Sequence, residues 1–230
     1  QLITQYYKSQ GDDNYGLNLG KGFSAISGSS TPYVSKGLNS DRIPGTERHL
    51  ISLQYSDSDF LGQELVGQVY YRDESLRYYP FPTVNANKQA TAFSSSQQDT
   101  DQYGMKLTLN SQLMDGWQIT WGLDAEHERF TSNQMFFDLA QASASGGLNN
   151  HKIYTTGRYP SYDITNLAAF LQSSYDINDI FTVSGGVRYQ YTENWVDDFI
   201  DYTQQQKIAA GKAISADAIP GGSVDYDNFL

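Results

Sequence analysis

Hydrophobic and polar residues alternate along several stretches of this chain, with a period of two residues. In the clearest stretch, tyrosine, methionine and leucine fill the odd positions from Tyr103 to Leu109, and glycine, lysine, threonine and asparagine fill the even ones. This period places one apolar and one polar face on a β-strand. Strong alternation predicts strands at 103–110, 117–126 and 181–192. Weaker alternation predicts strands at 1–7, 50–55, 65–71 and 167–175, with an eighth beginning near Phe229.

The connections between these strands alternate strictly in length. Short turns are predicted at 56–62, 111–116 and 176–179. Long connections are predicted at 9–47, 76–101, 133–164 and 201–227. Membrane barrels sort their connections in this way, with tight turns on one side and long loops on the other, whereas loops beyond about 15 structureless residues are rare in compact soluble domains. The pattern therefore predicts an all-β fold, a segment of an antiparallel transmembrane β-barrel with short periplasmic turns and long extracellular loops.

Composition agrees with this fold class and excludes several others. Hydrophobic residues make up 39% of the 230 residues, and no run approaches the roughly 18 apolar residues that a transmembrane helix needs. Barrel strands escape such a search because their alternating residues average out. The net charge of −11 argues against nucleic acid as a partner. The absence of cysteine removes disulfides, thiol chemistry and cysteine-based zinc sites.

Bilayer physics assigns the two faces of each strand. Hydrocarbon favours apolar side chains outside, and a wet lumen accepts polar ones inside. The side chains expected to face lipid include Trp117, Trp121 and Leu123. Those expected to face the lumen are Lys106, Asp124, Glu126 and Arg188. Tyrosines near the strand ends are expected to form aromatic girdles, because their rings are apolar and their hydroxyls reach water: Tyr71, Tyr103, Tyr175, Tyr189 and Tyr191.

Neither the carboxylates nor the histidines predict a catalytic or metal site. The acidic residues at 124, 126 and 128 share one strand face about 7 Å apart. That spacing suits a calcium site or acid–base chemistry, but we interpret the three as a solvated lumen wall, partly paired with cations on neighbouring strands. His49, His127 and His151 lie in separate regions, so no local metal spacing exists. No nucleophile elbow is present, and we expect no enzyme, no bound metal and no intrinsic cofactor.

Clustered aromatic and cationic residues are the feature of the long connections that favours binding. Exposed aromatics together with arginine usually mark binding surfaces. The alternative is that these large loops pack against themselves. Our candidate ligand-binding residues are Arg77, Tyr78, Tyr79, Arg129, Arg158 and Tyr159.

Several segments resemble the TonB-dependent outer-membrane siderophore receptors. They are Arg42-Ile43-Pro44-Gly45-Thr46-Glu47-Arg48, Tyr70-Tyr71-Arg72-Asp73-Glu74, Gly122-Leu123-Asp124 ahead of Glu128-Arg129-Phe130, and the stretch from Pro220 to Phe229. The resemblance covers essentially all 230 residues, about a third of such a receptor. It implies a barrel of 22 strands that follows a plug domain. We expect residues 1–230 to be part of the barrel domain, with the plug domain absent, and both chain ends to be cut inside strands.

The resemblance also implies a function. Such a receptor is a multi-pass protein of the bacterial outer membrane, surrounded by its lipid, and TonB contacts it through the plug. The implied ligand is a ferric hydroxamate–citrate siderophore of the aerobactin type, and iron would enter only as part of that ligand. Bacteriocins or phages are further implied partners of the loops. The alternatives are a passive porin-like barrel and a soluble or surface β-rich binding module.

Overall fold

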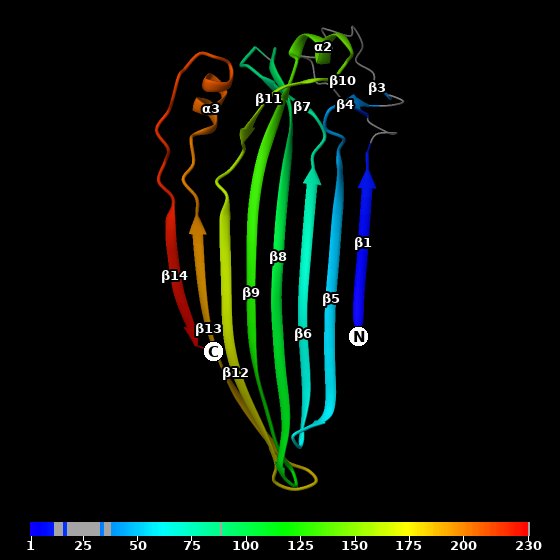
Figure 1. The fold of residues 1–230 in the computed structure, drawn as a ribbon, viewed down its shortest axis with the longest axis vertical. Coiled ribbons are helices and arrows are strands. Elements are labelled where there is room, and N and C mark those ends of the chain that lie inside the picture. The colour runs from blue at the N-terminus through cyan, green and yellow to red at the C-terminus, as the bar shows by residue number, and fades with distance from the viewer. Residues whose placement is uncertain (12–15, 18–32, 35–37, 88, 230) are drawn as a thin grey trace.

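The computed structural model describes residues 1–11, 16–17, 33–34, 38–87 and 89–229. Its main feature is a long antiparallel sheet, in which eight strands follow one another in chain order (Figure 1). These strands are β1 (Leu2–Gln10), β5 (Gly45–Phe60), β6 (Gln63–Arg77), β8 (Ala90–Met114), β9 (Trp117–Phe137), β12 (Tyr162–Asp176), β13 (Thr182–Val196) and β14 (Gly222–Phe229). Two shorter strands join the sheet at one end, where β7 (Phe81–Val84) pairs with β8 and β11 (Lys152–Gly157) pairs with β9. All seven predicted strands are present.

The short and long connections lie at opposite ends of the sheet, as the sequence predicts (Figure 1). Residues 61–62, 115–116 and 177–181 form the short turns. At the other end lie α2 (Leu139–Ala144), α3 (Tyr202–Ala209), β4 (Asn39–Ser40) and β10 (Asn149–Asn150), the last two paired in parallel. A small pair, β2 (Gly16–Leu17) and β3 (Tyr33–Val34), belongs to the predicted connection 9–47, most of which lies outside the described residues. Neither described helix is long and apolar enough to cross a membrane.

The strands are longer than predicted, and two long connections are correspondingly shorter. β8 begins at Ala90, so the predicted loop 76–101 is wrong from residue 90 onward. β9 continues to Phe137 and β12 begins at Tyr162, so the predicted connection 133–164 is wrong only at its two ends. In these upper segments both strand faces carry polar residues, for example throughout 94–102. Backbone pairing continues there without any alternation of hydropathy, and the sequence pattern therefore underestimates the strands.

The predicted start of the eighth strand is also wrong. β14 begins at Gly222, and Phe229 is near its other end, in register with Tyr189 of β13. The alternation is reversed on β14, because Asp225 and Asp227 lie in register with Glu193 and Tyr191, on the face where other strands carry apolar residues. This reversal hides the strand from a search for an apolar face.

The two faces of the central strands differ as predicted. Leu123, Leu167 and Val187 are exposed on one face. On the other face Nη1 of Arg188 lies 2.8 Å from the Asp124 carboxylate, two strands away. The same polar face also contains the ring of Phe170, which lies over Gly122. A Cβ atom added to Gly122 would come within 2.6 Å of this ring. The predicted pairing of acidic residues with cations is thus confirmed for Asp124.

The aromatic boundary of the apolar face crosses the sheet diagonally. On β6 and β8 it is formed by Tyr71 and Tyr103, which are in register. On β13 it is formed by Tyr189. Following the strand register from Tyr189 across the sheet leads through Ala169 and Leu123 to Leu107 of β8. Leu107 is nearer the turn end of β8 than Tyr103, so the boundary is lower on β13 than on β8. Strands that tilt relative to the membrane plane produce such a slope. At the opposite boundary, Trp117 and Tyr175 meet edge to face, with ring centroids 6.3 Å apart.

The long-loop end has its own small core. Phe93, Phe137 and Ala142 are buried together, and Leu139 packs partly against them. Arg42 is buried beside this region, where its guanidinium donates to the Ser95 carbonyl oxygen at 2.7 Å and to the Asn133 side chain. Burial lowers the pKa of Arg42 to about 10, because desolvation penalises the charged form.

Candidate ligand-binding site

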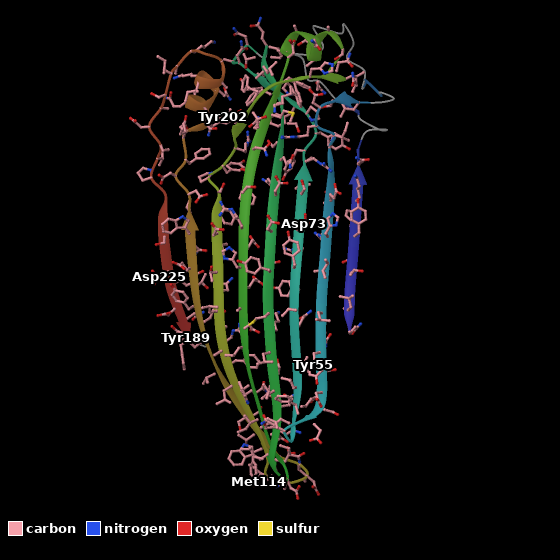
Figure 2. All side chains as sticks on the ribbon, viewed as in Figure 1. Tyr55, Asp73, Met114, Tyr189, Tyr202 and Asp225 are labelled. Atoms are coloured by element: carbon pink, nitrogen blue, oxygen red, sulfur yellow. The ribbon has the colours of Figure 1, made fainter. Side chains whose placement is uncertain are left out.

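The six predicted ligand-binding residues occupy three separate places at the long-loop end. Arg77, Tyr78 and Tyr79 lie at the end of β6 and just beyond it. Arg129 lies on β9, and Arg158 and Tyr159 follow β11. Figure 2 shows Tyr202 at this same end of the molecule, far from Met114 at the turn end. The structure therefore does not bring the six together into one cluster.

Three of the predicted residues, Arg77, Tyr78 and Tyr79, contact neighbouring segments of the sheet. Nη2 of Arg77 lies 3.3 Å from the Glu47 carboxylate of β5, which also attracts Lys8 at 3.8 Å. The Tyr78 hydroxyl donates to the Gln98 side chain at 3.2 Å. The ring of Tyr79 lies against Gly11, where a Cβ would approach its hydroxyl within 2.1 Å. These contacts hold the end of β6 in place, and the charge of Arg77 is matched by Glu47.

Arg129 is also matched by carboxylates. Its guanidinium lies 2.9 Å from Asp163 and 3.3 Å from Asp197. It occupies an odd position on β9, so its side chain shares the face of Trp121 and Leu123. The sequence contained this signal, because the alternation of β9 continues past Glu126 and puts Arg129 on the apolar side.

Arg158 has a different environment. Its Cζ lies 5.3 Å from the ring centroid of Tyr159 and 5.8 Å from that of Tyr202, both within the range of cation–π attraction. Its Nη1 donates to Oε1 of Gln134. In the described part of the chain, no carboxylate lies within ion-pair distance of Arg158. Arg158 is thus a positioned cation whose charge is not neutralised by an acid.

A buried chain of polar contacts positions the guanidinium. Gln134 is fully buried, and its Nε2 donates to Oγ of Ser94 at 2.7 Å. This bond leaves the amide oxygen of Gln134 to accept from Arg158. The Arg158 backbone N–H donates to the Ser132 carbonyl at 3.2 Å, which fixes the residue just beyond the β11–β9 pairing.

Aromatic rings complete this arrangement, which we call the Arg158 cluster: Arg158, Tyr159, Gln134, Phe136, Tyr154 and Tyr202. Phe136 stacks on Tyr154 with centroids 4.8 Å apart, and Tyr202 lies 6.0 Å from Phe136. Burial raises the pKa of Tyr154 and of Tyr202, so both hydroxyls stay protonated near neutral pH. The sequence did not predict Gln134 or Tyr202 as site residues, because the contacts that join them to Arg158 span 24 and 44 positions in the chain.

The helix that carries Tyr202 is fixed by local sequence and by β11. Asp201 precedes α3, and its carboxylate accepts from the N–H groups of Thr203 and Gln204, as an N-cap does. The Gln205 side chain accepts from the Gly157 N–H at 2.6 Å, which satisfies a donor on the free edge of β11. Tyr202, at the start of α3, is thereby held over the Arg158 cluster.

Comparison with known proteins identifies the architecture. A family model described as the β-barrel of TonB-dependent receptor-like proteins matches residues 1–229. The chain belongs to this family. The antiparallel sheet is accordingly part of a receptor barrel, and its apolar face is the outer, lipid-facing surface. Arg77 and Arg129 then lie on outward-facing positions of their strands, whereas Gln134 and Phe136, at even positions of β9, lie on the inward face.

Individual relatives are similar over at least 95% of this chain. It is 90% identical over 230 residues to the ferric aerobactin receptor of Klebsiella pneumoniae, covering all of this chain and 31% of that protein. It is 88% identical to the ferric aerobactin receptor of Escherichia coli, over 95% of this chain and 30% of that protein. The rhizobactin receptor of Rhizobium meliloti (strain 1021) is 42% identical over all of this chain and 31% of its own length. The receptor-barrel chain thus spans just under a third of these relatives.

A solved structure supports the fold. The copper transporter OprC superposes with a TM-score of 0.51 at 17% identity, covering 84% of this chain and 29% of that one. At this identity the likeness concerns the fold alone.

The inward face of the receptor barrel is lined with charge at mid-height. A cavity of about 170 Å³ is bordered by Lys106, Asp124, Glu126, Arg188 and Gln190, among others. Asp124 is paired with Arg188, and Glu126 accepts from the Tyr70 hydroxyl. All four residues predicted to face the lumen therefore border one polar cavity.

Proposed function

We propose that this chain is part of the barrel of an outer-membrane receptor that binds a ferric hydroxamate–citrate siderophore of the aerobactin type and imports it in a TonB-dependent manner. The observation in the structure that carries the proposal is the Arg158 cluster, a cation with two aromatic neighbours and no carboxylate partner among the described residues. The names of the two relatives at 90% and 88% identity support the same ligand class.

The chemistry of the cluster suits such a ligand. A citrate-centred hydroxamate chelate carries carboxylates, and a guanidinium is suited to binding a carboxylate through two parallel N–H donors. Arg158 is held in place before binding, so little side-chain entropy is lost when a ligand arrives. Tyr159 is exposed beside it and offers a rigid surface for packing. Of the predicted residues we therefore propose Arg158 and Tyr159 as the main contacts. Tyr78 and Tyr79 stay predictions, whereas we propose that Arg77 and Arg129 contribute little, because carboxylates already match their charges.

The remaining parts of the receptor belong to the same proposal. Residues 1–230 contribute multi-pass strands to the barrel domain, and a plug domain elsewhere in the receptor provides the contact with TonB. Outer-membrane lipid surrounds the apolar face. Iron is part of the siderophore and not a resident cofactor. Bacteriocins or phages that use the extracellular loops are further proposed partners.

The test is equilibrium binding of ferric aerobactin by the full-length receptor carrying Arg158→Ala. A charge-assisted hydrogen bond contributes about 1.5 to 3 kcal/mol, so the dissociation constant should rise about ten- to hundredfold. Arg129→Ala is the matched control, because Arg129 is already paired with two carboxylates. Uptake that does not saturate and does not require TonB would favour the passive-porin alternative and contradict the proposal.

A further inference from the structure

Thr156 of β11 is buried, and its hydroxyl makes no hydrogen bond with any described residue. Its side chain is 6% exposed. Burying a hydroxyl without a partner costs free energy, so its retention here calls for a physical reason. Thr156 is in register with Gln134 and alternates with Tyr154 and Arg158, which places it on the strand face of the Arg158 cluster.

Tyr202 spans the row formed by Thr156 and Gln134. Phe136 and Arg158 flank the paired residues Thr156 and Gln134 on opposite sides along the strands. The ring of Tyr202 lies 6.0 Å from the ring of Phe136 and 5.8 Å from Cζ of Arg158. Burial raises the pKa of the Tyr202 hydroxyl, and the positive charge of Arg158 opposes that effect, because it attracts the hydroxyl oxygen. A side chain from a separate helix thus occupies the position from which a ligand would reach the guanidinium.

We propose that Arg158, Thr156 and Gln134 form a subsite for a ligand carboxylate, and that Tyr202 covers this subsite until the carboxylate displaces it from the guanidinium. This inference rests on the proposed function and deepens it, because it assigns one chemical group of the siderophore to named residues. Arg158 and the Thr156 hydroxyl supply the donors, and Gln134 keeps Arg158 oriented through its bond to Ser94. Thr156 and Arg158 are ligand contacts in this scheme, Gln134 is a positioning residue, and Tyr202 is a cover.

The first test compares two threonines of the same strand in the full-length receptor. Thr156→Val is nearly isosteric and removes only the hydroxyl, and Thr155→Val makes the same change on the exposed face. We expect Thr156→Val to raise the dissociation constant of ferric aerobactin about three- to tenfold and Thr155→Val to leave it unchanged. The ligand-free receptor should keep or gain thermal stability with Thr156→Val, because an unsatisfied buried polar group is removed. Equal binding by the two variants would overturn the subsite.

The second test concerns the cover. Tyr202→Phe keeps the ring and removes the hydroxyl that competes for Arg158, so association with ferric aerobactin should become about two- to tenfold faster. Slower association or weaker binding by Tyr202→Phe would make Tyr202 a ligand contact and overturn its role as a cover.

A ligand change separates this inference from the proposed function. Ferric aerobactin with its free carboxylates converted to methyl esters should bind the parent receptor more weakly and should lose its sensitivity to Thr156→Val. If the parent binds ferric aerobactin but the ester behaves like the free acid in both variants, the subsite is wrong while the receptor function stands. If the parent receptor does not bind ferric aerobactin at all, the proposed function itself fails.

Discussion

The hydroxyl of Tyr70 on β6 donates a hydrogen bond to the carboxylate of Glu126 on β9, although β8 lies between the two strands. Gly104 of β8 is in register with both residues and has no side chain to block the way. A Cβ at this position would lie 2.7 Å from the Tyr70 hydroxyl oxygen and 2.9 Å from the Ala125 carbonyl oxygen. A glycine thus lets an aromatic side chain link two strands that are not neighbours.

Gly104→Ala is therefore expected to displace Tyr70 and to destabilise the barrel by about 1 to 3 kcal/mol, the usual cost of overpacking. The measurement is the free energy of unfolding of the full-length receptor in urea, in detergent or a bilayer. Gly185→Ala is the matched control, because a Cβ there meets nothing within 4 Å. If both variants lost a similar free energy of unfolding, the cause would be the loss of glycine itself and not a clash between the new Cβ and the Tyr70 side chain.

The turn between β5 and β6 contains a strained leucine. Leu61 has φ 54°, the one non-glycine residue with positive φ in the described ranges, and Gly62 beside it has φ 78°. Such a two-residue turn favours asparagine followed by glycine. Leu61→Asn should raise the free energy of unfolding by about 1 kcal/mol, because the left-handed conformation costs an ordinary residue about 1 to 2 kcal/mol. Ile180→Asn, at a comparably exposed position, 84% against 85%, without positive φ, should give no such gain.

The assignment of the two faces predicts opposite responses to arginine. Leu123→Arg puts a cation on the lipid side and should cost about 2 to 4 kcal/mol near the bilayer midplane, enough to impair assembly. Thr108→Arg puts the cation on the inward face, where position 108 pairs with Gly122 of β9, and this variant should be tolerated. Assembly is measured by the heat-modifiable migration of the full-length receptor on SDS gels. Equal behaviour of the two variants would reverse or abolish the face assignment.

The three predicted arginines should differ in their effect on ligand binding. Arg77→Ala and Arg129→Ala remove cations already matched by carboxylates on outward-facing positions, so each should change the dissociation constant of ferric aerobactin less than twofold. The effect of Arg129→Ala on the free energy of unfolding should be below about 1 kcal/mol, as for exposed ion pairs. Arg158→Ala should weaken binding at least tenfold. A larger loss for Arg129→Ala than for Arg158→Ala would place the site on another part of the loops.

The sequence by itself determined the strand order, the positions of the short turns and the two faces of the central strands. Wherever one strand face meets lipid, as in 103–110, apolar and polar residues alternate along the sequence with a period of two. Turn residues mark where this alternation ends. The signal ends where both faces carry polar residues, as in 94–102, so the upper part of β8 could not be read from the sequence. β14 was missed for another reason, because its alternation is reversed relative to the neighbouring strand.

The candidate site required the tertiary structure, because its members come from distant parts of the chain. Arg158 and Tyr159 were predicted from their residue types, but the same reasoning selected Arg77 and Arg129 equally. Only the folded arrangement shows that carboxylates neutralise Arg77 and Arg129, while Arg158 is held by Gln134 and lies against the Tyr202 ring. Residue type sets what a side chain can bind, and the packing of neighbouring strands and loops decides whether its charge is already satisfied.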